Sequence, residues 1–363
     1  MRLGIDASRV VHGRGGVATY TRELVHALVD SRRVDEIVLF DLDRGRSKRS
    51  IFETALGKLP SNVVTAPADR SELEGLDLFH APGFAMPPPG APRYVFTLHD
   101  LTVLSHPFCH TIENRVRTLA SISLALARGA TVLAVSKATK QEAIRLLAIP
   151  TESVEVVPPM LNPIFKMAGD HEADTRAAER LGVREPYVLA VASLEPRKNF
   201  GRLLDAWSSL GTATGANQLV VVAAEGWRQG RVRRRLERMT GDGSVVKIGH
   251  VPDEVLAGLY RRANAFVFPS LAEGFGLPVV EAMACGAPVV TSKLSSLPEV
   301  CREAALLVDP EDTDEIASAV AYLLGDRNLR QRLRDHGLER ARAFSREAVV
   351  PRLFQVYRRA AQR

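Results

Sequence analysis

The sequence predicts an α/β protein made of two Rossmann-like domains with parallel sheets, and three observations support this. Short apolar runs rich in Val, Ile and Leu alternate with amphipathic helical patterns along most of the 363 residues. Such alternation is typical of parallel sheets covered by helices. The pattern stops in a segment rich in Pro and Gly, residues 157–174, and then starts again. A chain of this length also commonly forms two domains.

The first repeat of the pattern covers the N-terminal part of the chain. Short β-branched runs predict strands, and apolar residues three and four apart predict helices. The predicted strands are residues 3–5, 37–40, 63–65, 76–79, 94–98 and 131–134. The predicted helices are residues 19–28 and 113–127.

The second repeat follows the Pro-rich segment, which we interpret as a linker. Its predicted strands are residues 187–192, 218–223, 245–248, 265–268, 289–291 and 305–308. Its predicted helices are residues 200–210, 231–239 and 253–262, the last with Asp253 as N-cap. We therefore expect domains at 1–163 and 164–346, followed by a C-terminal helix over 347–363.

Composition and charge exclude several classes of protein. The 48 Lys and Arg against 42 Asp and Glu are spread over both halves, which argues against a nucleic-acid binder. Three widely spaced cysteines form neither a disulfide framework nor a zinc site. The uncharged, mostly apolar helical stretch at residues 118–127, between Arg117 and Arg128, is too short to span a bilayer. We expect a cytoplasmic protein, and a peripheral contact with the inner face of the plasma membrane is compatible with its charge.

The strongest local signal is the stretch 269–288, which reads PSLAEGFGLPVVEAMACGAP. It begins at the end of a predicted strand and continues through a Gly-x-Gly loop into a helix. Pro278 fits the first helical position, and Gly286 fits the position that follows the helix. The free N–H groups at this helix start would lie at the carboxyl edge of a parallel sheet, which is a natural anion site.

Two carboxylates flank that anion site. Glu273 precedes the glycines, and Glu281 is expected in the first helical turn. Because like charges repel, they are unsuited to phosphate but can accept hydrogen bonds from sugar hydroxyls on either side of a diphosphate. The alternative is that Glu281 only stabilises the helix dipole.

A second signal, SLEPRKN at residues 193–199, follows the strand at 187–192. Its adjacent cations, Arg197 and Lys198, can neutralise a diphosphate. The alternative is that Arg197 and Lys198 are only solvated charges of a surface loop.

A third signal is the glycine-rich loop Gly13-Arg14-Gly15-Gly16-Val-Ala, which formally matches a dinucleotide fingerprint. With Asp41 at the end of the second strand, this makes an NAD-dependent oxidoreductase the serious rival. However, residues 8–12 separate the first strand from the glycines, whereas the fingerprint requires a direct turn. We favour a loop that caps a ligand held by the other domain.

Three further polar features of the sequence give weaker signals. His99-Asp100 lies at the end of the predicted strand 94–98, and active-site residues are common at the carboxyl ends of parallel strands. The alternative is that His99 is a buried structural residue. Asp41-Leu-Asp43 resembles a metal-binding Asp-x-Asp, but a plain turn is favoured. The arginine-rich stretch 228–238 is interpreted as a solvated helix face rather than a membrane patch.

These residues together resemble the retaining nucleotide-sugar glycosyltransferases of family 4, which have the GT-B fold. The stretch Glu273–Glu281 carries most of the resemblance. The other carriers are Ser193–Asn199, Gly15-Gly16, His99-Asp100, Ala134-Val135-Ser136 and Gly249-His250-Val251-Pro252. Glu-Pro-Arg-Lys-Asn and His-Asp-Leu resemble the mannosyltransferase-like branch that builds bacterial polysaccharides.

The resemblance implies a donor site between the two domains and a C-terminal helix that returns to the first domain. The expected catalytic residues are His99, Arg197, Lys198 and Glu273. The expected donor-binding residues are Gly15, Gly16, Ser193, Val251, Gly274, Phe275, Gly276, Leu277 and Glu281. Gly16 would approach the diphosphate, Val251 the base, Glu281 the ribose, and His99 the transferred sugar.

The expected reaction moves a hexose, with mannose from GDP-mannose as the best guess, from a GDP- or UDP-sugar to a saccharide or lipid-linked acceptor. The resemblance implies no cofactor and no metal. Besides the oxidoreductase, two rivals stay open: a GT-B epimerase or hydrolase of nucleotide sugars, which needs no acceptor, and a non-catalytic sugar-binding module.

Overall fold

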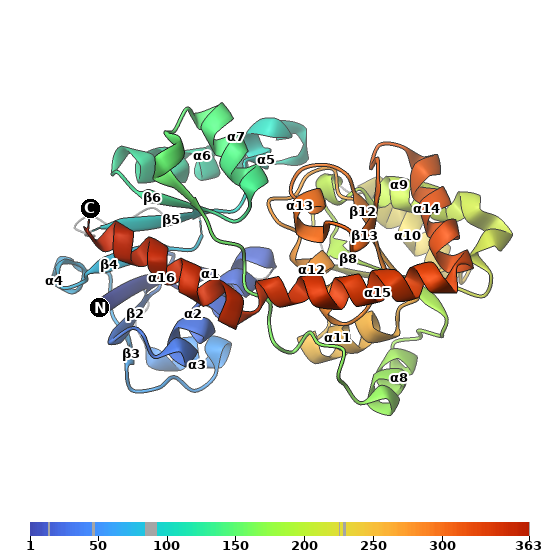
Figure 1. Ribbon diagram of the computed structural model, residues 1–363, viewed down its shortest axis with the longest axis horizontal. Helices are drawn as coiled ribbons and strands as arrows, with labels where there is room; N and C mark the ends of the chain where they lie inside the picture. Colours follow the sequence, from blue (N-terminus) through green and yellow to red (C-terminus); the bar gives the residue numbers. More distant parts are fainter. Residues whose placement is uncertain (14, 46–47, 84–92, 225, 228–229, 363) are drawn as a thin grey trace. The chain divides into compact units, whose positions relative to one another are not determined.

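The computed structural model describes residues 1–13, 15–45, 48–83, 93–224, 226–227 and 230–362 (Figure 1). Its contacts divide the chain into two compact units. Unit 1 comprises Met1–Met160 and Arg346–Arg363, and unit 2 comprises Leu161–Ser345. Each unit contains one parallel sheet with helices packed on it, so the predicted fold class is confirmed.

In unit 1 the described strands form a seven-stranded sheet in the order β3-β2-β1-β4-β5-β6-β7. The strands are β1 (Arg2–Asp6), β2 (Glu36–Phe40), β3 (Val63–Thr65), β4 (Leu78–Ala81), β5 (Tyr94–Leu98), β6 (Thr131–Ala134) and β7 (Val154–Val156). The helices are α1 (Ser8–His12), α2 (Gly16–Ser31), α3 (Arg49–Leu56), α4 (Arg70–Glu74), α5 (Thr102–Ser105), α6 (Ile112–Ala127) and α7 (Lys137–Leu147). Strand β4 lies two residues later than predicted, because Leu76 belongs to the turn after α4 and bonds back to Leu73.

In unit 2 the described strands form a six-stranded sheet in the order β10-β9-β8-β11-β12-β13. The strands are β8 (Tyr187–Ser193), β9 (Gln218–Ala224), β10 (Val245–Ile248), β11 (Ala265–Phe268), β12 (Val289–Ser292) and β13 (Ala305–Val308). The helices are α8 (His171–Arg180), α9 (Phe200–Leu210), α10 (Gly230–Gly241), α11 (Asp253–Arg262), α12 (Leu277–Ala284), α13 (Leu297–Cys301), α14 (Thr313–Gly325) and α15 (Arg327–Ala341).

The predictions for the end of the linker and for the N-cap of α11 are wrong. The linker does not reach Asp174, because Asp170 caps α8 by accepting hydrogen bonds from the amides of Glu172 and Ala173. Asp253 is not an N-cap but the first residue of α11, and Pro252 holds the cap position. The Asp253 carboxylate instead accepts a hydrogen bond from the Asn162 side chain at 3.3 Å.

The C-terminal helix α16 (Arg346–Gln362) packs on unit 1, against α2, β4 and β5, as predicted (Figure 1). Arg346 forms an ion pair with the buried carboxylate of Glu23 at 2.6 Å. The Tyr357 hydroxyl lies 2.6 Å from His80 Nδ1, and burial lowers the pKa of His80 to about 3. The neutral His80 ring therefore joins the helix to the sheet. Among the helices of the described residues, none combines the length and apolar character that crossing a bilayer requires.

Candidate active site

The strongest sequence signals meet in unit 2, at the carboxyl ends of two neighbouring strands. Strand β8 ends at Ser193 and β11 ends at Phe268, and these strands pair in parallel. From β8 the chain continues to β9 and β10 on one side, whereas β11 continues to β12 and β13 on the other. Open α/β sheets bind ligands at such a switch point, because the two loops diverge and leave a crevice.

A cluster of buried charges joins the two loops. Lys198 Nζ lies 2.7 Å from Glu273 Oε1, and the Arg197 guanidinium lies 2.7 Å from Glu273 Oε2. Arg197 also approaches Glu195 at 3.5 Å and donates to the Ala272 carbonyl at 2.7 Å. All four charged side chains are at most 12% exposed. Two cations and two carboxylates therefore balance each other inside the protein.

The cluster shifts the protonation equilibria of its members. Burial alone would raise the pKa of Glu273, but the charges of Arg197 and Lys198 outweigh it and lower that pKa to about 2. Burial lowers the pKa of Lys198, and the positive charge of Arg197 lowers it further, while Glu273 acts in the opposite direction. Glu273 is thus an anion at neutral pH, and its negative charge offsets the positive charges beside it.

Local backbone geometry holds the two cations in place. Residues Pro196–Lys198 form one 3-10 turn, and Asn199 follows in the left-handed region at φ 60°. The Asn199 side chain donates to the carbonyls of Pro269 and Pro310, at 3.0 and 2.6 Å. Lys198 Nζ also lies over the Phe268 ring, 5.1 Å from its centroid. The cations are therefore fixed by packing before any ligand binds.

The loop that carries Glu273 is fixed by the turn after β12. The Glu273 amide donates to Ser295 Oγ at 2.9 Å, and the Ser296 hydroxyl donates to the carbonyls of Glu273 and Phe275, at 2.9 and 3.0 Å. Gly276 has φ 100°, and a Cβ there would lie 2.6 Å from Leu297 Cδ2. Glycine is thus required for both its backbone angle and its size.

Helix α12 begins at this glycine. Gly276 is its N-cap and Leu277 its first residue. The sequence predicts Pro278 as the first residue of the helix, but Pro278 is the second. The amides of a first helical turn have no partner within the helix and can bind an anion or a hydroxyl. Gly286 follows the helix at φ 78°, as predicted.

Glu281 is the fifth residue of α12, so the expectation that it lies in the first turn is wrong. At this depth a carboxylate interacts little with the helix dipole, which weakens the purely structural interpretation. Its side chain is 8% exposed, and the Tyr260 hydroxyl lies 3.3 Å from Oε2. Of the other predicted residues of unit 2, Ser193 is the last residue of β8, Val251 follows β10, and Gly274 lies in the loop between β11 and α12.

The glycine loop of unit 1 lies at the start of α2. Gly15 is the N-cap at φ 89°, Gly16 is the first residue, and Arg14 lies outside the described residues. Helix α1 fills the segment between β1 and this loop, so the direct turn of a dinucleotide fingerprint is not formed. His12 Nε2 lies 2.7 Å from Asp41 Oδ2, and the Arg44 amide donates to Oδ1. Both oxygens of Asp41 are thus engaged within the fold.

His99 follows β5 in unit 1. Its Nε2 donates to the Pro82 carbonyl at 2.6 Å, and the Tyr20 ring meets it edge-on at 4.9 Å. Burial lowers the pKa of His99, so the ring is neutral at pH 7. Asp100 accepts hydrogen bonds from the amide and hydroxyl of Thr102 and so shapes the following turn.

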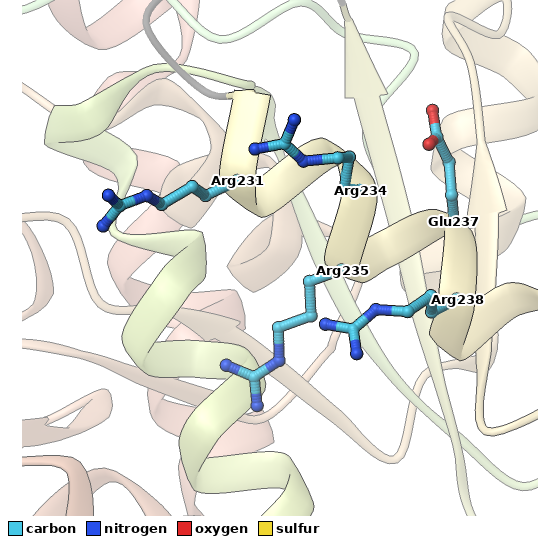
Figure 2. Close-up of a pocket in the computed structure, with 5 residues that line it drawn as sticks. All are labelled: Arg231, Arg234, Arg235, Glu237 and Arg238. Atoms are coloured by element: carbon cyan, nitrogen blue, oxygen red, sulfur yellow. The ribbon is translucent and has the colours of Figure 1, made fainter.

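The arginine-rich helix α10 forms a separate surface of unit 2. Figure 2 shows a shallow pocket there, lined by Arg231, Arg234, Arg235, Glu237 and Arg238. Arg235 reaches α9, where it pairs with Asp205 and donates to Ser208 at 3.2 Å. Leu236, on the opposite side of α10, belongs to the core. Arg231, Arg233, Arg234 and Arg238 are exposed on this helix, and Arg228 lies outside the described residues.

Several residues that build the site are not predicted from the sequence. Glu195, which accepts a hydrogen bond from Ser193, lies inside the motif at 193–199 without a predicted role. Ser295 and Ser296 come from a strand–helix turn that no local pattern connects to Glu273. Their adjacency depends on the order of β11 and β12 in the sheet, which periodicity alone does not give.

Two family models together match most of the chain. The family model described as Glycosyltransferase Family 4 matches residues 14–163, and the model described as Glycosyl transferases group 1 matches residues 172–340. The chain is 32% identical to O-antigen chain mannosyltransferase B of Escherichia coli, over 94% of this chain and 96% of that protein.

Solved structures share the fold. Sucrose-phosphate synthase from Thermosynechococcus elongatus is similar at a TM-score of 0.75 and 22% identity, over 99% of this chain and 98% of that one. HepE from Anabaena, in complex with UDP and glucose, is similar at a TM-score of 0.75 and 18% identity, over 98% and 99%. The chain therefore belongs to glycosyltransferase family 4, in its mannosyltransferase-like branch, and has the GT-B fold.

Proposed function

We propose that this glycosyltransferase is a retaining, metal-independent enzyme that transfers mannose from GDP-mannose to a saccharide or lipid-linked acceptor in bacterial polysaccharide synthesis. The observation that carries the proposal is the buried Arg197–Lys198–Glu273 cluster at the switch point of the unit 2 sheet. The mannosyl choice is supported by the relation to the O-antigen mannosyltransferase.

In the proposed complex the donor diphosphate binds Arg197 and Lys198, together with the first-turn amides of α12. Glu281 accepts hydrogen bonds from the ribose hydroxyls, and Glu273, with the Phe275 and Gly276 amides, holds the sugar hydroxyls. From unit 1, the Gly15-Gly16 amides would approach the diphosphate, and His99 would contact the sugar. Ser193, Val251, Gly274 and Leu277 complete the proposed set of donor contacts.

The proposed reaction breaks the bond between the sugar C1 and the diphosphate oxygen and forms a bond from C1 to the acceptor oxygen on the same face. The acceptor hydroxyl loses its proton to an oxygen of the departing diphosphate. Arg197 and Lys198 stabilise the negative charge that grows on this leaving group. Because Glu273 already holds both cations, and Lys198 also packs over the Phe268 ring, little reorganisation is needed.

The test is an assay with GDP-mannose and UDP-glucose, each with and without a mannosyl oligosaccharide acceptor, before and after EDTA treatment. We expect GDP release that requires the acceptor and resists EDTA, and an α-linked product by NMR. Rapid turnover without the acceptor would favour the epimerase or hydrolase alternative. An inverted product or loss of activity in EDTA would contradict the proposed mechanism.

A further inference from the structure

Four buried polar side chains of unit 1 form a line of hydrogen bonds from the C-terminal helix to α2. The Tyr357 hydroxyl on α16 lies 2.6 Å from His80 Nδ1, and His80 Nε2 lies 2.7 Å from Thr97 Oγ1. The Tyr20 hydroxyl lies 3.2 Å from the same Thr97 oxygen. Helix α16 packs against α2, β4 and β5, and each of these contributes one of the other three residues (Figure 1). We call Tyr357, His80, Thr97 and Tyr20 the buried polar network.

The buried polar network lies wholly inside the protein. Its four residues are at most 3% exposed. Buried polar groups without partners destabilise a fold, whereas apolar groups of the same shape would cost little or nothing at these positions. Stability alone therefore does not account for these residue types. A fully bonded polar network does, however, fix its members in one arrangement.

A hydrogen is available for each of the three contacts. Burial lowers the pKa of His80 to about 3, so the ring is neutral, and one nitrogen donates while the other accepts. Burial also raises the pKa of Tyr20 to about 12, so its hydroxyl keeps the proton. When Nδ1 donates to Tyr357, the Thr97 hydroxyl donates to Nε2 and Tyr20 donates to Thr97. When Nε2 donates to Thr97 instead, Tyr357 donates to Nδ1 and Thr97 donates to Tyr20, so either tautomer satisfies every contact.

Tyr20 connects the buried polar network to His99. The Tyr20 ring meets the His99 ring edge-on, with centroids 4.9 Å apart and the planes at 89°. Because Thr97 and His99 are two positions apart at the end of β5, one tyrosine contacts Thr97 through its hydroxyl and His99 through its ring. His99 Nε2 also donates to the Pro82 carbonyl at 2.6 Å. Tyr20 and Pro82 therefore both restrain the His99 ring.

Attachment of α16 to unit 1 is the alternative role for the buried polar network. Other contacts already provide it, since Arg346 pairs with the buried Glu23 at 2.6 Å and Leu353 of α16 is 1% exposed. The Tyr357 ring is itself buried, and a phenylalanine would retain its packing. The Tyr357 hydroxyl is therefore not needed for attachment, but it forms one end of the buried polar network.

We infer that Tyr20 is a positioning residue that holds the His99 ring, and that the buried polar network carries this restraint from Tyr357 on the C-terminal helix. The catalytic consequence rests on the proposed function, in which His99 contacts the transferred sugar. A ring that is free to turn spends only part of its time in the productive geometry, which lowers the rate. The positioning itself involves neither donor nor acceptor, so it can be measured separately from sugar transfer.

Matched substitutions separate hydrogen bonding from packing. Thr97→Val keeps the shape of the side chain and removes the hydroxyl, whereas Thr97→Ser removes a methyl group and keeps the hydroxyl. Tyr20→Phe and Tyr357→Phe each remove one hydroxyl from an end of the buried polar network. Tyr94→Phe is the control, because the Tyr94 hydroxyl is buried in the same sheet and has no hydrogen-bond partner among the described residues.

The first measurement is steady-state transfer from GDP-mannose to a mannosyl acceptor. We expect Thr97→Val, Tyr20→Phe and Tyr357→Phe to lower kcat about tenfold with an unchanged KM for the donor, as for a contact that matters only in the transition state. Thr97→Ser and Tyr94→Phe should retain the wild-type kcat. A packing role predicts the reverse order, with Thr97→Ser slower than Thr97→Val, and that order would overturn the inference.

The two ends of the buried polar network can also be combined. If Tyr357 acts through Tyr20, the double variant Tyr20→Phe/Tyr357→Phe should be no slower than Tyr20→Phe alone. Effects that multiply in the double variant would mean that Tyr357 acts independently, and this would overturn the part of the inference that concerns the C-terminal helix.

The second measurement needs no substrate. It follows the exchange of the His99 Nε2 proton with water by NMR of the protein with labelled histidine, with the signal assigned from His99→Gln. We expect exchange about tenfold faster in Thr97→Val, Tyr20→Phe and Tyr357→Phe, and unchanged exchange in Thr97→Ser and Tyr94→Phe. Wild-type exchange in Tyr20→Phe would overturn the positioning. Faster exchange with an unchanged kcat would instead contradict the proposed contact of His99 with the sugar.

Discussion

Lys198 Nζ lies 2.7 Å from Glu273 Oε1, although the two residues are 75 positions apart in the chain. Arg197 occupies the other oxygen of the same carboxylate. The cation pair that we propose binds the diphosphate is thus already neutralised by a residue of the protein. In the proposed complex the donor competes with Glu273 for these cations, or shares them with it.

Replacement of Lys198 by Met should lower kcat/KM for sugar transfer by about 100-fold or more, because a fixed cation stabilises the leaving diphosphate in the transition state. Initial rates of GDP release in the presence of acceptor measure this. Lys58→Met serves as control, since Lys58 is exposed after α3. A Lys198→Met rate within about threefold of the wild type would remove the leaving-group role.

The ionised carboxylate of Glu273 should stabilise unit 2, and its protonation in acid should remove that stabilisation. Its pKa falls from 4.5 to about 2 on folding, so the stabilisation is complete above pH 4.5 and is lost as the pH falls toward 2. The unfolding temperature of the wild type should therefore exceed that of Glu273→Gln at neutral pH, and the gap should narrow on acidification. A difference in unfolding temperature that does not change with pH would contradict this prediction. Glu172→Gln is the control, because the Glu172 side chain is 84% exposed.

The ion pair of Arg346 with Glu23 should be important for holding α16 on unit 1. The Glu23 side chain is 1% exposed, so Arg346→Met leaves a buried carboxylate without its cation, at a cost of about 3–5 kcal/mol. Hydrogen exchange of α16 amides should speed up accordingly. Arg359→Met, which breaks the ion pair between Glu155 and the 66% exposed Arg359 side chain, should cost less than about 1 kcal/mol. Equal effects of the two variants would refute the role of burial.

Replacement of Gly276 by Ala should destabilise unit 2 by about 1–3 kcal/mol, because φ 100° and the approach of Leu297 both oppose a Cβ. The double variant Gly276→Ala/Leu297→Ala should not recover this loss, since the backbone angle stays strained. Chemical denaturation measures both. Gly241→Ala, at the end of α10 with open space around it, should be neutral or stabilising.

Much of the fold follows from sequence periodicity, because parallel strands are buried on both faces and are read as apolar runs. Strands β5, β6, β10 and β11 lie where the sequence predicts them. Strand β7 was not predicted, since Val154–Val156 is short and carries Glu155 in its middle. Helix α8 is not predicted, and its first four residues fall in the predicted linker, because its composition is polar and only Ala178 is buried.

The candidate site could be predicted only motif by motif. The sequence indicates that residues 193–199 and 273–281 follow strands, and therefore lie at carboxyl edges of a sheet. It does not indicate that β8 and β11 are neighbours, and this pairing is what brings Lys198 to Glu273. The sequence therefore predicts Glu273 as a catalytic residue that holds sugar hydroxyls, but it does not predict the contact of Glu273 with both cations.

The most direct test of the donor site is isothermal titration of GDP and UDP into the wild type, Lys198→Met and Glu273→Gln. Removal of the Glu273 charge leaves Arg197 and Lys198 with Glu195 as their only buried anionic partner in the cluster. Glu273→Gln should therefore bind the nucleoside diphosphate about tenfold or more tightly than the wild type, and Lys198→Met more weakly. Unchanged affinities in both variants would contradict the claim that this cluster is where the diphosphate binds.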